Sequence, residues 1–204
     1  MLRITGGLFG GRKIHTPPEG TRPSHAKLRQ ALYNSLQVDV PGARVLDLYA
    51  GAGTLGLEAL SRGAESVVFV EASKNVCKLL ERNVRELEVD SRSRVYCEKV
   101  DKSARLLEDL AAQFGLFDLV VADPPYAGGV ELDLVNGAWW SWDRILASGG
   151  KLVLEWGRTK SRFTELPAVA PFLEKVREKT YGDSILTTYV RPSSEIQETQ
   201  NDPV

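Results

Sequence analysis

The strongest constraint on the fold is a repeated change of hydrophobic period along residues 44–190. Short runs of almost continuous apolar residues, such as VLDLYA and SVVFVE, alternate with segments whose apolar residues recur every three or four positions. Strands that are apolar on both faces need covering on both faces, which is typical of a parallel sheet between layers of helices. The pattern therefore predicts an α/β fold with a doubly wound, mostly parallel, seven-stranded sheet.

The same pattern predicts the order of the elements. Strands are expected at 44–50, 66–71, 94–98, 117–123 and 151–156, followed by two segments near 171–180 and 185–190. Helices are expected at 54–62, at 73–88 with Ser73 as N-cap, at 103–112 and around 131–147. Trp139, Trp140 and Trp142 fall in the last of these helices, where we expect partial burial in the core rather than a stacking platform.

The chain is expected to divide into three parts. Residues 1–40 form an N-terminal extension, in which short β-compatible runs and paired glycines predict a hairpin, and leucines spaced four apart from Ser24 predict a helix. Residues 41–191 form the main domain. The polar segment 192–204 is expected to be a disordered tail.

Composition places the chain among ordinary globular proteins, with 204 residues of which 43% are hydrophobic and 26% charged. No apolar run approaches the length of a membrane span and the first residues show no signal-peptide pattern, so a cytoplasmic protein is expected, and we expect a monomer. Cys77 and Cys97 lack metal-ligand or disulfide-framework spacing and are predicted to be small buried hydrophobic residues. His15 and His25 have no ligand-like neighbours, so no metal is expected.

Positive charge is concentrated at the N-terminus. Residues 1–44 carry a net charge of +5, whereas the remaining 160 residues carry −6. Clustered cations favour contact with a polyanion through its phosphates, although a solvated basic face would give the same pattern. The candidate contact residues are Arg3, Arg12, Lys13, Arg22 and Arg29.

A glycine loop follows the first strand of the main domain. Gly51, Gly53 and Gly56 satisfy GxGxxG between a predicted strand and a predicted helix, a context that suits an adenosine-containing ligand. Gly51 and Gly53 can adopt positive φ and let a ligand approach the backbone closely. The motif alone leaves a nicotinamide dinucleotide or a structural turn open.

Three acidic residues near strand ends narrow the choice of ligand. Asp47 can accept hydrogen bonds from the loop and approach an α-ammonium group, which S-adenosylmethionine has and a nicotinamide dinucleotide lacks. Glu71 ends the second strand, where it can accept from both ribose hydroxyls of either ligand. Asp101, after the third strand, can accept from the adenine amino group or can instead cap a helix.

The fourth strand leads into Asp123-Pro124-Pro125-Tyr126, the most informative motif of the chain. An exocyclic amine of a base is a poor nucleophile, and hydrogen bonds to the Asp123 carboxylate and the Pro124 carbonyl would make its lone pair available. The prolines fix φ and donate no competing hydrogen bond, and Tyr126 offers a flat face for the base. The motif predicts methyl transfer to an exocyclic amine. A methyl transfer to pyrimidine carbon would need a positioned Cys nucleophile, which the sequence does not indicate.

Together these motifs resemble a known family. RITGGLFGGRKI, TRPSHAKLRQALYNSL, VLDLYAGAGTLGLEALSRGA, VVFVE, VVADPPY and YGDSILTTY resemble the bacterial 16S rRNA guanine-N2 methyltransferases over almost all of residues 1–190. The resemblance implies a class I, Rossmann-like methyltransferase fold, S-adenosylmethionine as cofactor, and a guanine N2 of 16S rRNA, in an assembled or partly assembled small subunit, as acceptor.

The resemblance also implies residue roles. It assigns Asp47, Gly51, Gly53, Glu71 and Asp101 to the cofactor, Asp123 through Tyr126 to catalysis, and Arg22 to a place beside the catalytic loop. The chain departs from the family pattern at His25-Ala26, where an acid is usual, and at Lys102, a candidate cofactor contact where a small residue is common.

Three other functions share part of these features. An adenine-N6 DNA methyltransferase would use the same chemistry but usually has a large target-recognition domain. A nicotinamide oxidoreductase would leave Asp-Pro-Pro-Tyr without a role. A non-catalytic RNA-binding assembly factor of the same fold would need neither the cofactor loop nor the catalytic loop.

Overall fold

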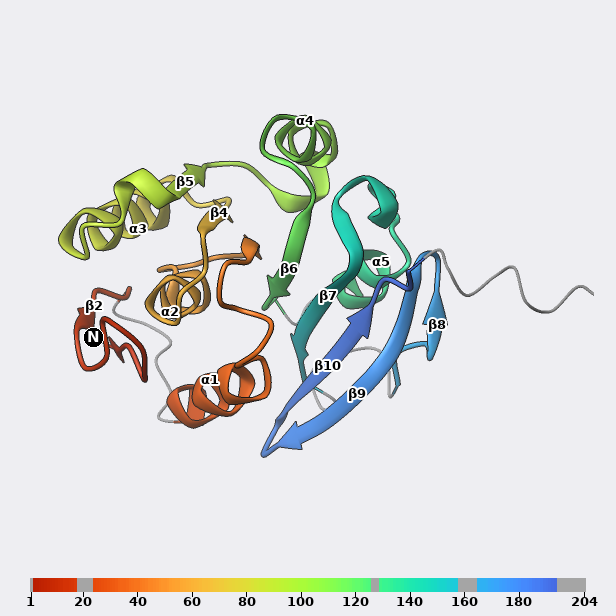
Figure 1. The fold of residues 1–204 in the computed structure, drawn as a ribbon, viewed down its shortest axis with the longest axis horizontal. Coiled ribbons are helices and arrows are strands. Elements are labelled where there is room, and N and C mark those ends of the chain that lie inside the picture. The colour runs from red at the N-terminus through yellow and green to blue at the C-terminus, as the bar shows by residue number, and fades with distance from the viewer. Residues whose placement is uncertain (1, 18–23, 126–128, 158–164, 194–204) are drawn as a thin grey trace, which may run out of the picture.

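The computed structural model describes residues 2–17, 24–125, 129–157 and 165–193. The expected α/β architecture is confirmed, with a twisted central sheet between two groups of helices (Figure 1). Arg22 and Tyr126, two of the candidate site residues, lie outside the described residues. Within the described ranges, no helix is long and apolar enough to cross a membrane.

The central sheet has eight strands in the order β5-β4-β3-β6-β7-β10-β9-β8. Their bounds are β3 Arg44–Leu48, β4 Ser66–Val70, β5 Ser93–Tyr96, β6 Phe117–Ala122, β7 Leu146–Trp156, β8 Val169–Ala170, β9 Leu173–Tyr181 and β10 Ser184–Val190. The pairs from β5 to β7 are parallel, and β10, β9 and β8 join antiparallel. The sheet is thus the expected one with the two-residue β8 added at its edge.

The order of the strands reverses at β3. The chain passes from β3 outward through β4 to β5, and then returns to place β6 on the other side of β3. Asp47 of β3 pairs in register with Val121 of β6, so these two strands end level with each other. Ligands of doubly wound sheets bind outside the carboxyl ends of the strands at such a reversal.

Helices cover both faces of the sheet (Figure 1). They are α1 Ser24–Ser35, α2 Thr54–Ser61, α3 Lys74–Glu86, α4 Ala104–Phe114 and α5 Val130–Val135, with short 3-10 turns η1 Asp90–Arg92, η2 Val100–Lys102 and η3 Trp142–Arg144. One core contains Leu32 of α1, Leu57 of α2 and Leu80 of α3. A second core contains Leu107 of α4 and Leu134 of α5. We call the side of the sheet covered by α1, α2 and α3 the α1 face.

The expected N-terminal hairpin is present. β1 Leu2–Arg3 pairs antiparallel with β2 Lys13–Ile14. Ile4 and Ile14 are buried in the core of the α1 face, and the Leu8 amide donates to the Ser61 carbonyl of α2 at 2.7 Å. A Cβ at Gly7 would lie 1.9 Å from that same carbonyl oxygen, so only glycine permits this approach. The hairpin therefore shares the core of the main domain.

The helix predicted around 131–147 is present only in its first part, as α5, and the prediction is wrong beyond Val135. α5 ends at Val135, η3 follows, and β7 already begins at Leu146. Gly137 takes φ 65°, and its position lies so close to the Trp140 carbonyl that a side chain has no room. The predicted burial of tryptophans is confirmed, because Trp140 and Trp142 are buried and Trp142 donates from Nε1 to the Leu134 carbonyl at 3.0 Å.

The prediction for the two cysteines is only partly confirmed: Cys77 is buried as expected, but the two residues are not free buried thiols. Cys77 of α3 and Cys97 form a disulfide with Cα atoms 6.1 Å apart, and Cys97 is exposed. The physical reason is topological: α3 follows β4, and Cys97 follows β5, which is the neighbouring parallel strand. The two residues meet although their spacing of 20 positions matches no short cysteine motif.

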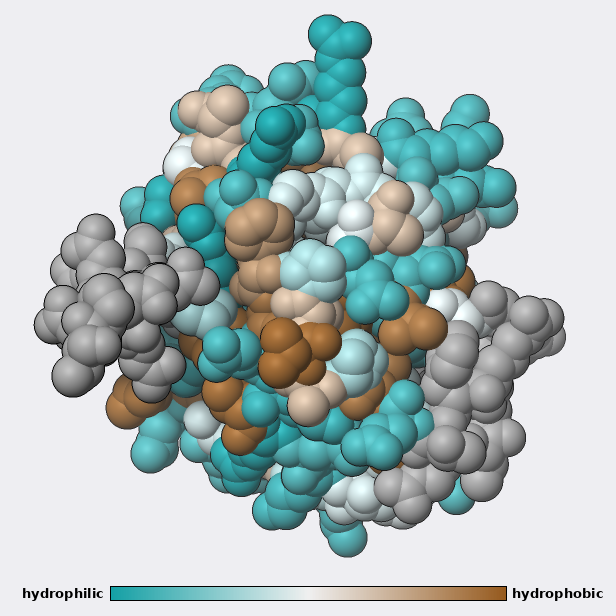
Figure 2. All heavy atoms as spheres, turned by 90° about the vertical axis from the view of Figure 1, so that its right-hand side faces the viewer, coloured by the Kyte–Doolittle hydropathy of each residue, from teal (hydrophilic) through white to brown (hydrophobic). Residues whose placement is uncertain are grey.

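Exposed apolar side chains gather near the β8 edge of the sheet. Figure 2 looks onto this side of the molecule and shows apolar residues at its centre with hydrophilic residues around them. Val169, Phe172 and Val176 are the exposed large apolar residues of this region. Beside them, Phe172 lines a pocket of about 310 Å³ with the segment from Asn136 to Trp142. This pocket belongs to the side of the sheet opposite the α1 face, because Trp140 and Trp142 pack in the second core.

Candidate active site

The candidate site lies at the carboxyl ends of β3 and β6. The glycine loop follows β3, and Asp123-Pro124 follows β6 on the neighbouring strand. Because β3 and β6 are parallel and in register, the topology places both loops at one edge of the sheet. The two motifs that the sequence singled out are therefore adjacent in the structure.

The backbone of the glycine loop is held in left-handed conformations. Gly51 has φ 54° and Gly53 has φ 82°, as expected for a loop that needs glycine. A Cβ at Gly53 would lie 2.3 Å from Leu80 Cδ1, whereas a Cβ at Gly51 would meet nothing within 4 Å. Gly53 is thus required by packing, and Gly51 leaves open space beside the loop.

Tyr49 precedes the loop with φ 58°, an unusual conformation for a bulky residue. Such strain is typical of positions whose surroundings fix the backbone for function. Burial raises the pKa of the Tyr49 phenol, and the nearby carboxylates of Asp101, Asp133 and Glu131 raise it further. Tyr49, at the start of the loop after β3, therefore lies close to acidic residues that follow β5 and β6.

Asp47 is buried beneath the loop. Its Oδ2 accepts a hydrogen bond from the Gly56 amide at 2.8 Å, and its Oδ1 has no hydrogen-bond partner among the described residues. Burial raises the pKa of Asp47 to about 7; the Gly56 amide opposes the shift, and Glu71 adds to it. A buried carboxylate with one open oxygen is suited to a cationic ligand, which would compensate its desolvation.

Glu71 is fixed by two backbone amides. Gly51 donates to Oε2 at 2.9 Å, and Ser73 donates to Oε1 at 2.8 Å. A carboxylate has about four acceptor positions, so each oxygen keeps a lone pair for a hydroxyl. The predicted N-cap position of Ser73 is confirmed, but its side chain makes no capping hydrogen bond.

Asp101 and Lys102 lie exposed in η2, beyond β5. The N-cap residue of α4 is Ser103, not Asp101, so the structure does not use the Asp101 side chain as the cap of that helix. Its effect on the pKa of Tyr49 places Asp101 near the glycine-loop edge. In the same neighbourhood Glu131 of α5 is fully buried, and neither carboxylate oxygen has a partner among the described residues.

Asp123 is half-buried directly after β6, with Pro124 buried and Pro125 exposed. Burial raises the pKa of Asp123 well above its ordinary value, and the nearby Glu155 and Asp47 carboxylates raise it further. Three carboxylates thus gather at the ends of β3, β6 and β7. Such a site favours a ligand that brings positive charge.

Comparisons with known proteins agree with this geometry. Residues 2–190 match the family model described as conserved hypothetical protein 95. The chain belongs to this family.

Named relatives come from several bacteria. The putative rRNA methyltransferase YlbH of Bacillus subtilis is 30% identical over 185 residues, which cover 89% of this chain and 94% of that protein. Ribosomal RNA small subunit methyltransferase D of Haemophilus influenzae is 35% identical over 126 residues, covering 61% and 64% of the two chains. The solved structure of the putative methyltransferase yhhF of Escherichia coli is 26% identical with a TM-score of 0.73, covering 94% and 98%. The expected methyltransferase fold is confirmed.

The residues present fit S-adenosylmethionine. The open buried oxygen of Asp47 suits its ammonium group, the fixed carboxylate of Glu71 suits ribose hydroxyls, and Gly51 leaves space beside the backbone. When bound, S-adenosylmethionine supplies a methyl group on a positively charged sulfonium. The expected cofactor is supported by the methyltransferase relatives of the family as well as by this geometry. Within the described ranges, no group of three or more His, Cys, Asp or Glu could hold a metal ion.

One of the basic N-terminal residues is not available for RNA, so its prediction is wrong. Arg29 is buried and ion-paired with Glu58 at 3.4 Å, and it donates to the Arg3 carbonyl at 2.6 Å. Leu28 and Leu32, on the same helix α1, are buried. Because Arg29 lies between them in the sequence, their packing places its side chain in the same interior. The Arg29 charge therefore compensates Glu58.

The other described basic residues of the hairpin are exposed. Arg3 and Lys13 are directly paired across the two strands. Arg12 donates to the Glu86 carbonyl and lies over the Phe9 ring, 5.8 Å from its centre. Arg12 is thus tied to α3 and to the hairpin itself.

Sequence reasoning missed Asn83, which links the N-terminal extension to the cofactor loop. This buried side chain donates to the carbonyls of Ala52 and His15, and its oxygen accepts from the His15 amide, each at 2.9 Å. A polar residue on the otherwise apolar stripe of α3 was the one available signal. Through Asn83, the chain segment after β2 is held beside the glycine loop.

Proposed function

We propose that this protein transfers a methyl group from S-adenosylmethionine to the N2 amine of a guanine in small-subunit ribosomal RNA. The observation that carries the proposal is the position of Asp123 at the end of β6, beside the glycine loop of β3. The names of the Bacillus and Haemophilus relatives support ribosomal RNA as the substrate class. Guanine N2 as the acceptor rests on the resemblance of the motifs.

In this proposal the acidic residues of the glycine-loop edge hold the cofactor. Asp47 accepts a hydrogen bond from the cofactor's ammonium group, and Glu71 accepts hydrogen bonds from its ribose hydroxyls. Asp101 accepts from the adenine amino group, and Lys102 lies at the same pocket. Gly51 and Gly53 let the cofactor approach the backbone, as their positive φ angles favour.

Catalysis in this proposal depends on Asp123 and its loop. The Asp123 carboxylate and the Pro124 carbonyl accept hydrogen bonds from the two hydrogens of the guanine amine, which makes the nitrogen lone pair available. Asp123 then takes up the proton that the nitrogen loses when it gains the methyl group. Pro125 stiffens the loop, and Tyr126, outside the described residues, stacks on the base. Positioning of the nitrogen against the methyl group supplies most of the rate enhancement, with reacting atoms about 3–3.5 Å apart.

RNA contacts from the N-terminal extension are part of the same proposal. Arg3 and Lys13 are exposed and adjacent, and Arg12 lies on the same hairpin. Arg22, outside the described residues, follows the segment that Asn83 holds beside the glycine loop. These residues contact phosphates and so position the RNA without reading its bases.

Labelled methyl transfer tests the proposal directly. Purified protein and methyl-labelled S-adenosylmethionine are incubated with unmodified small subunits, with naked 16S rRNA and with DNA, and the products are digested to nucleosides. We expect N2-methylguanosine from the small subunit or its rRNA. N6-methyladenosine would overturn the acceptor, and the absence of label in any RNA would overturn the methyltransferase activity in favour of a binding role.

A further inference from the structure

A second basic surface lies at the tip of the β9-β10 hairpin, far from the N-terminal cluster in the sequence. Arg177, Lys179 and Tyr181 of β9 line a groove of about 430 Å³ together with Ala31, Asn34 and Ser35 of α1. We call this groove the α1-β9 groove. We propose that it holds the phosphate backbone of the RNA that flanks the methylated base, an inference that rests on the proposed function.

The strand register aligns this groove with the catalytic loop. Lys179 pairs with Leu186 of β10, and Leu186 pairs with Glu155 of β7. Ala122 pairs with Leu154, so the next residue, Asp123, is level with Glu155. A single row across four strands thus leads from Asp123 to Lys179, a backbone separation of about three strand spacings, or roughly 14 Å.

The groove residues and the catalytic carboxylate also share one side of the sheet. Directly paired residues of an antiparallel ladder point to the same face. Leu186 and Val153 pack in the core of the α1 face, and they share that face with Lys179 and Arg177 through the register. Val121 packs in the same core, so Asp123, two positions later, points to that side as well. An RNA strand that places its base at Asp123 therefore passes the groove.

Neither positive charge of the groove has an acidic partner in the part of the chain that the structure describes. Arg177 and Lys179 are exposed, and no ion pair to either is formed within the described ranges. Lys179 instead lies over the Tyr181 ring, 5.3 Å from its centre. No acidic side chain is among the residues that line the groove. Two uncompensated cations beside an acidic active site favour an anionic ligand there.

The α1 wall adds a neutral donor. Arg62 donates to Asn34 Oδ1 at 3.4 Å, which leaves the Asn34 amide nitrogen without a partner among the described residues. Proteins hold single-stranded or looped RNA with arginine and lysine side chains, amides and aromatic rings. A protein partner would instead be expected to cover an apolar centre, which this groove lacks.

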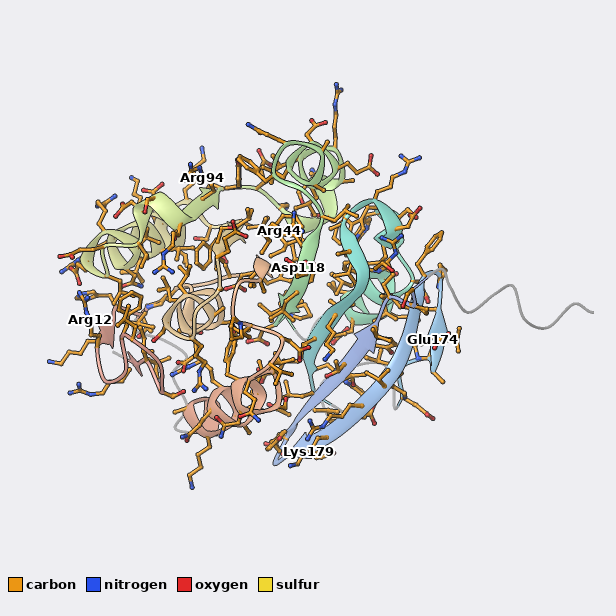
Figure 3. The ribbon with its side chains drawn as sticks, in the orientation of Figure 1. Arg12, Arg44, Arg94, Asp118, Glu174 and Lys179 are labelled. Atoms are coloured by element: carbon orange, nitrogen blue, oxygen red, sulfur yellow. A yellow bond between two sulfur atoms is a disulfide. The ribbon has the colours of Figure 1, made fainter. Side chains whose placement is uncertain are left out.

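Figure 3 shows that this surface and the basic N-terminal hairpin, which carries Arg12, lie at different places on the molecule. Lys179 lies at the lower tip of β9, next to α1, whereas Arg12 lies at the left margin of the molecule, on the N-terminal hairpin. Arg12 is also occupied by the Glu86 carbonyl. The α1-β9 groove and the hairpin therefore offer two separate positive surfaces on either side of α1 and α2.

The test compares two double variants that each remove two exposed arginine or lysine charges. Arg177→Ala with Lys179→Ala changes the groove. Arg105→Ala with Arg144→Ala removes exposed charges from α4 and η3, on the opposite side of the sheet, and is the matched control. Binding to naked 16S rRNA and to small subunits is measured over a range of salt concentrations, together with S-adenosylmethionine affinity.

We expect the groove variant to bind naked rRNA and small subunits several-fold more weakly, with a salt dependence less steep by about two units of slope, one for each lost phosphate contact. The control should bind like wild type, and S-adenosylmethionine affinity should be unchanged in both. The charge-conserving variant Arg177→Lys with Lys179→Arg should recover binding.

Three results would overturn the inference. The first is a groove variant that binds like wild type. The second is a groove variant that weakens binding only as much as the control does, which would indicate a net-charge effect. Weaker binding to small subunits alone, with naked rRNA bound normally, would instead assign the groove to a ribosomal protein. If the wild-type protein methylates guanine and the groove variant binds normally, only this inference fails; if the wild-type protein neither binds nor methylates rRNA, the proposed function fails with it.

Discussion

Asp123 at the end of β6 lies level with Glu155 of β7, and each carboxylate faces the α1 side of the sheet. Burial, this neighbour on β7 and Asp47 of β3, on the other side of β6, hold the pKa of Asp123 well above its ordinary value. The Asp123 carboxylate is therefore repelled by two acidic neighbours. A sulfonium cofactor would reduce this repulsion and so favour the ionised Asp123 that accepts from the amine.

Asp123→Ala is expected to reduce turnover by about 10²–10³ at saturating substrates, because one positioned acceptor for the transition state is lost. Asp123→Asn keeps an acceptor oxygen and should reduce turnover less than Asp123→Ala. Turnover is measured by labelled methyl transfer, with S-adenosylmethionine affinity as the control for folding. An Ala variant with normal turnover would reassign Asp123 to a structural turn.

S-adenosylmethionine affinity should fall as pH is lowered through about 7. The pKa of Asp47 is raised to about 7 in the free protein, and pairing with an ammonium group requires the ionised form. Cofactor binding must then lower this pKa and release a proton where Asp47 is partly protonated, so affinity rises with pH up to that pKa and levels off above it.

Calorimetry in buffers of different ionisation enthalpy, between about pH 6 and pH 8, measures this proton release. Asp47→Asn should bind weakly at every pH and release no proton. An affinity of the wild-type protein that is constant across this range would show that Asp47 does not pair with the ammonium group.

Asn83→Ala should lower the free energy of unfolding by about 1–3 kcal/mol, because the buried carbonyls of Ala52 and His15 lose their donor. It should also weaken S-adenosylmethionine binding, since the glycine loop loses its support. Urea unfolding and calorimetry measure the two effects. Asn75→Ala, at an exposed position of the same helix, is the matched control, and equal effects of both substitutions would contradict the coupling.

The sequence could predict those parts of the molecule that depend on local pattern. Apolar periodicity was sufficient for the parallel strands and for α3, and the positions of Asp47 and Asp123 followed because ligands bind where such strands end. The segment 131–147 could not be predicted this way, because the apolar spacing of a helix also fits a buried turn fixed by Gly137.

Contacts between distant segments were the least predictable. The meeting of Cys77 with Cys97 depends on two neighbouring strands, and the pairing of Arg29 with Glu58 depends on how α1 packs on α2. Arg29 was predicted to contact RNA because it lies close to other basic residues in the sequence. Only the packing shows that its charge is used inside the protein.

Arg29→Ala tests this reassignment. Glu58 is fully buried and accepts from the Thr5 amide and hydroxyl and from Arg62 in addition to Arg29. Removing one partner of a buried ion pair leaves its charge less compensated, so we expect a loss of about 3–5 kcal/mol in the free energy of unfolding. Lys27→Ala, at an exposed position of the same helix, should change stability by less than about 0.5 kcal/mol. Under conditions where the Arg29 variant remains folded, the salt dependence of its RNA binding should equal that of wild type, because Arg29 neutralises no phosphate. A stable Arg29→Ala protein with a flatter salt dependence would return Arg29 to the RNA-binding surface.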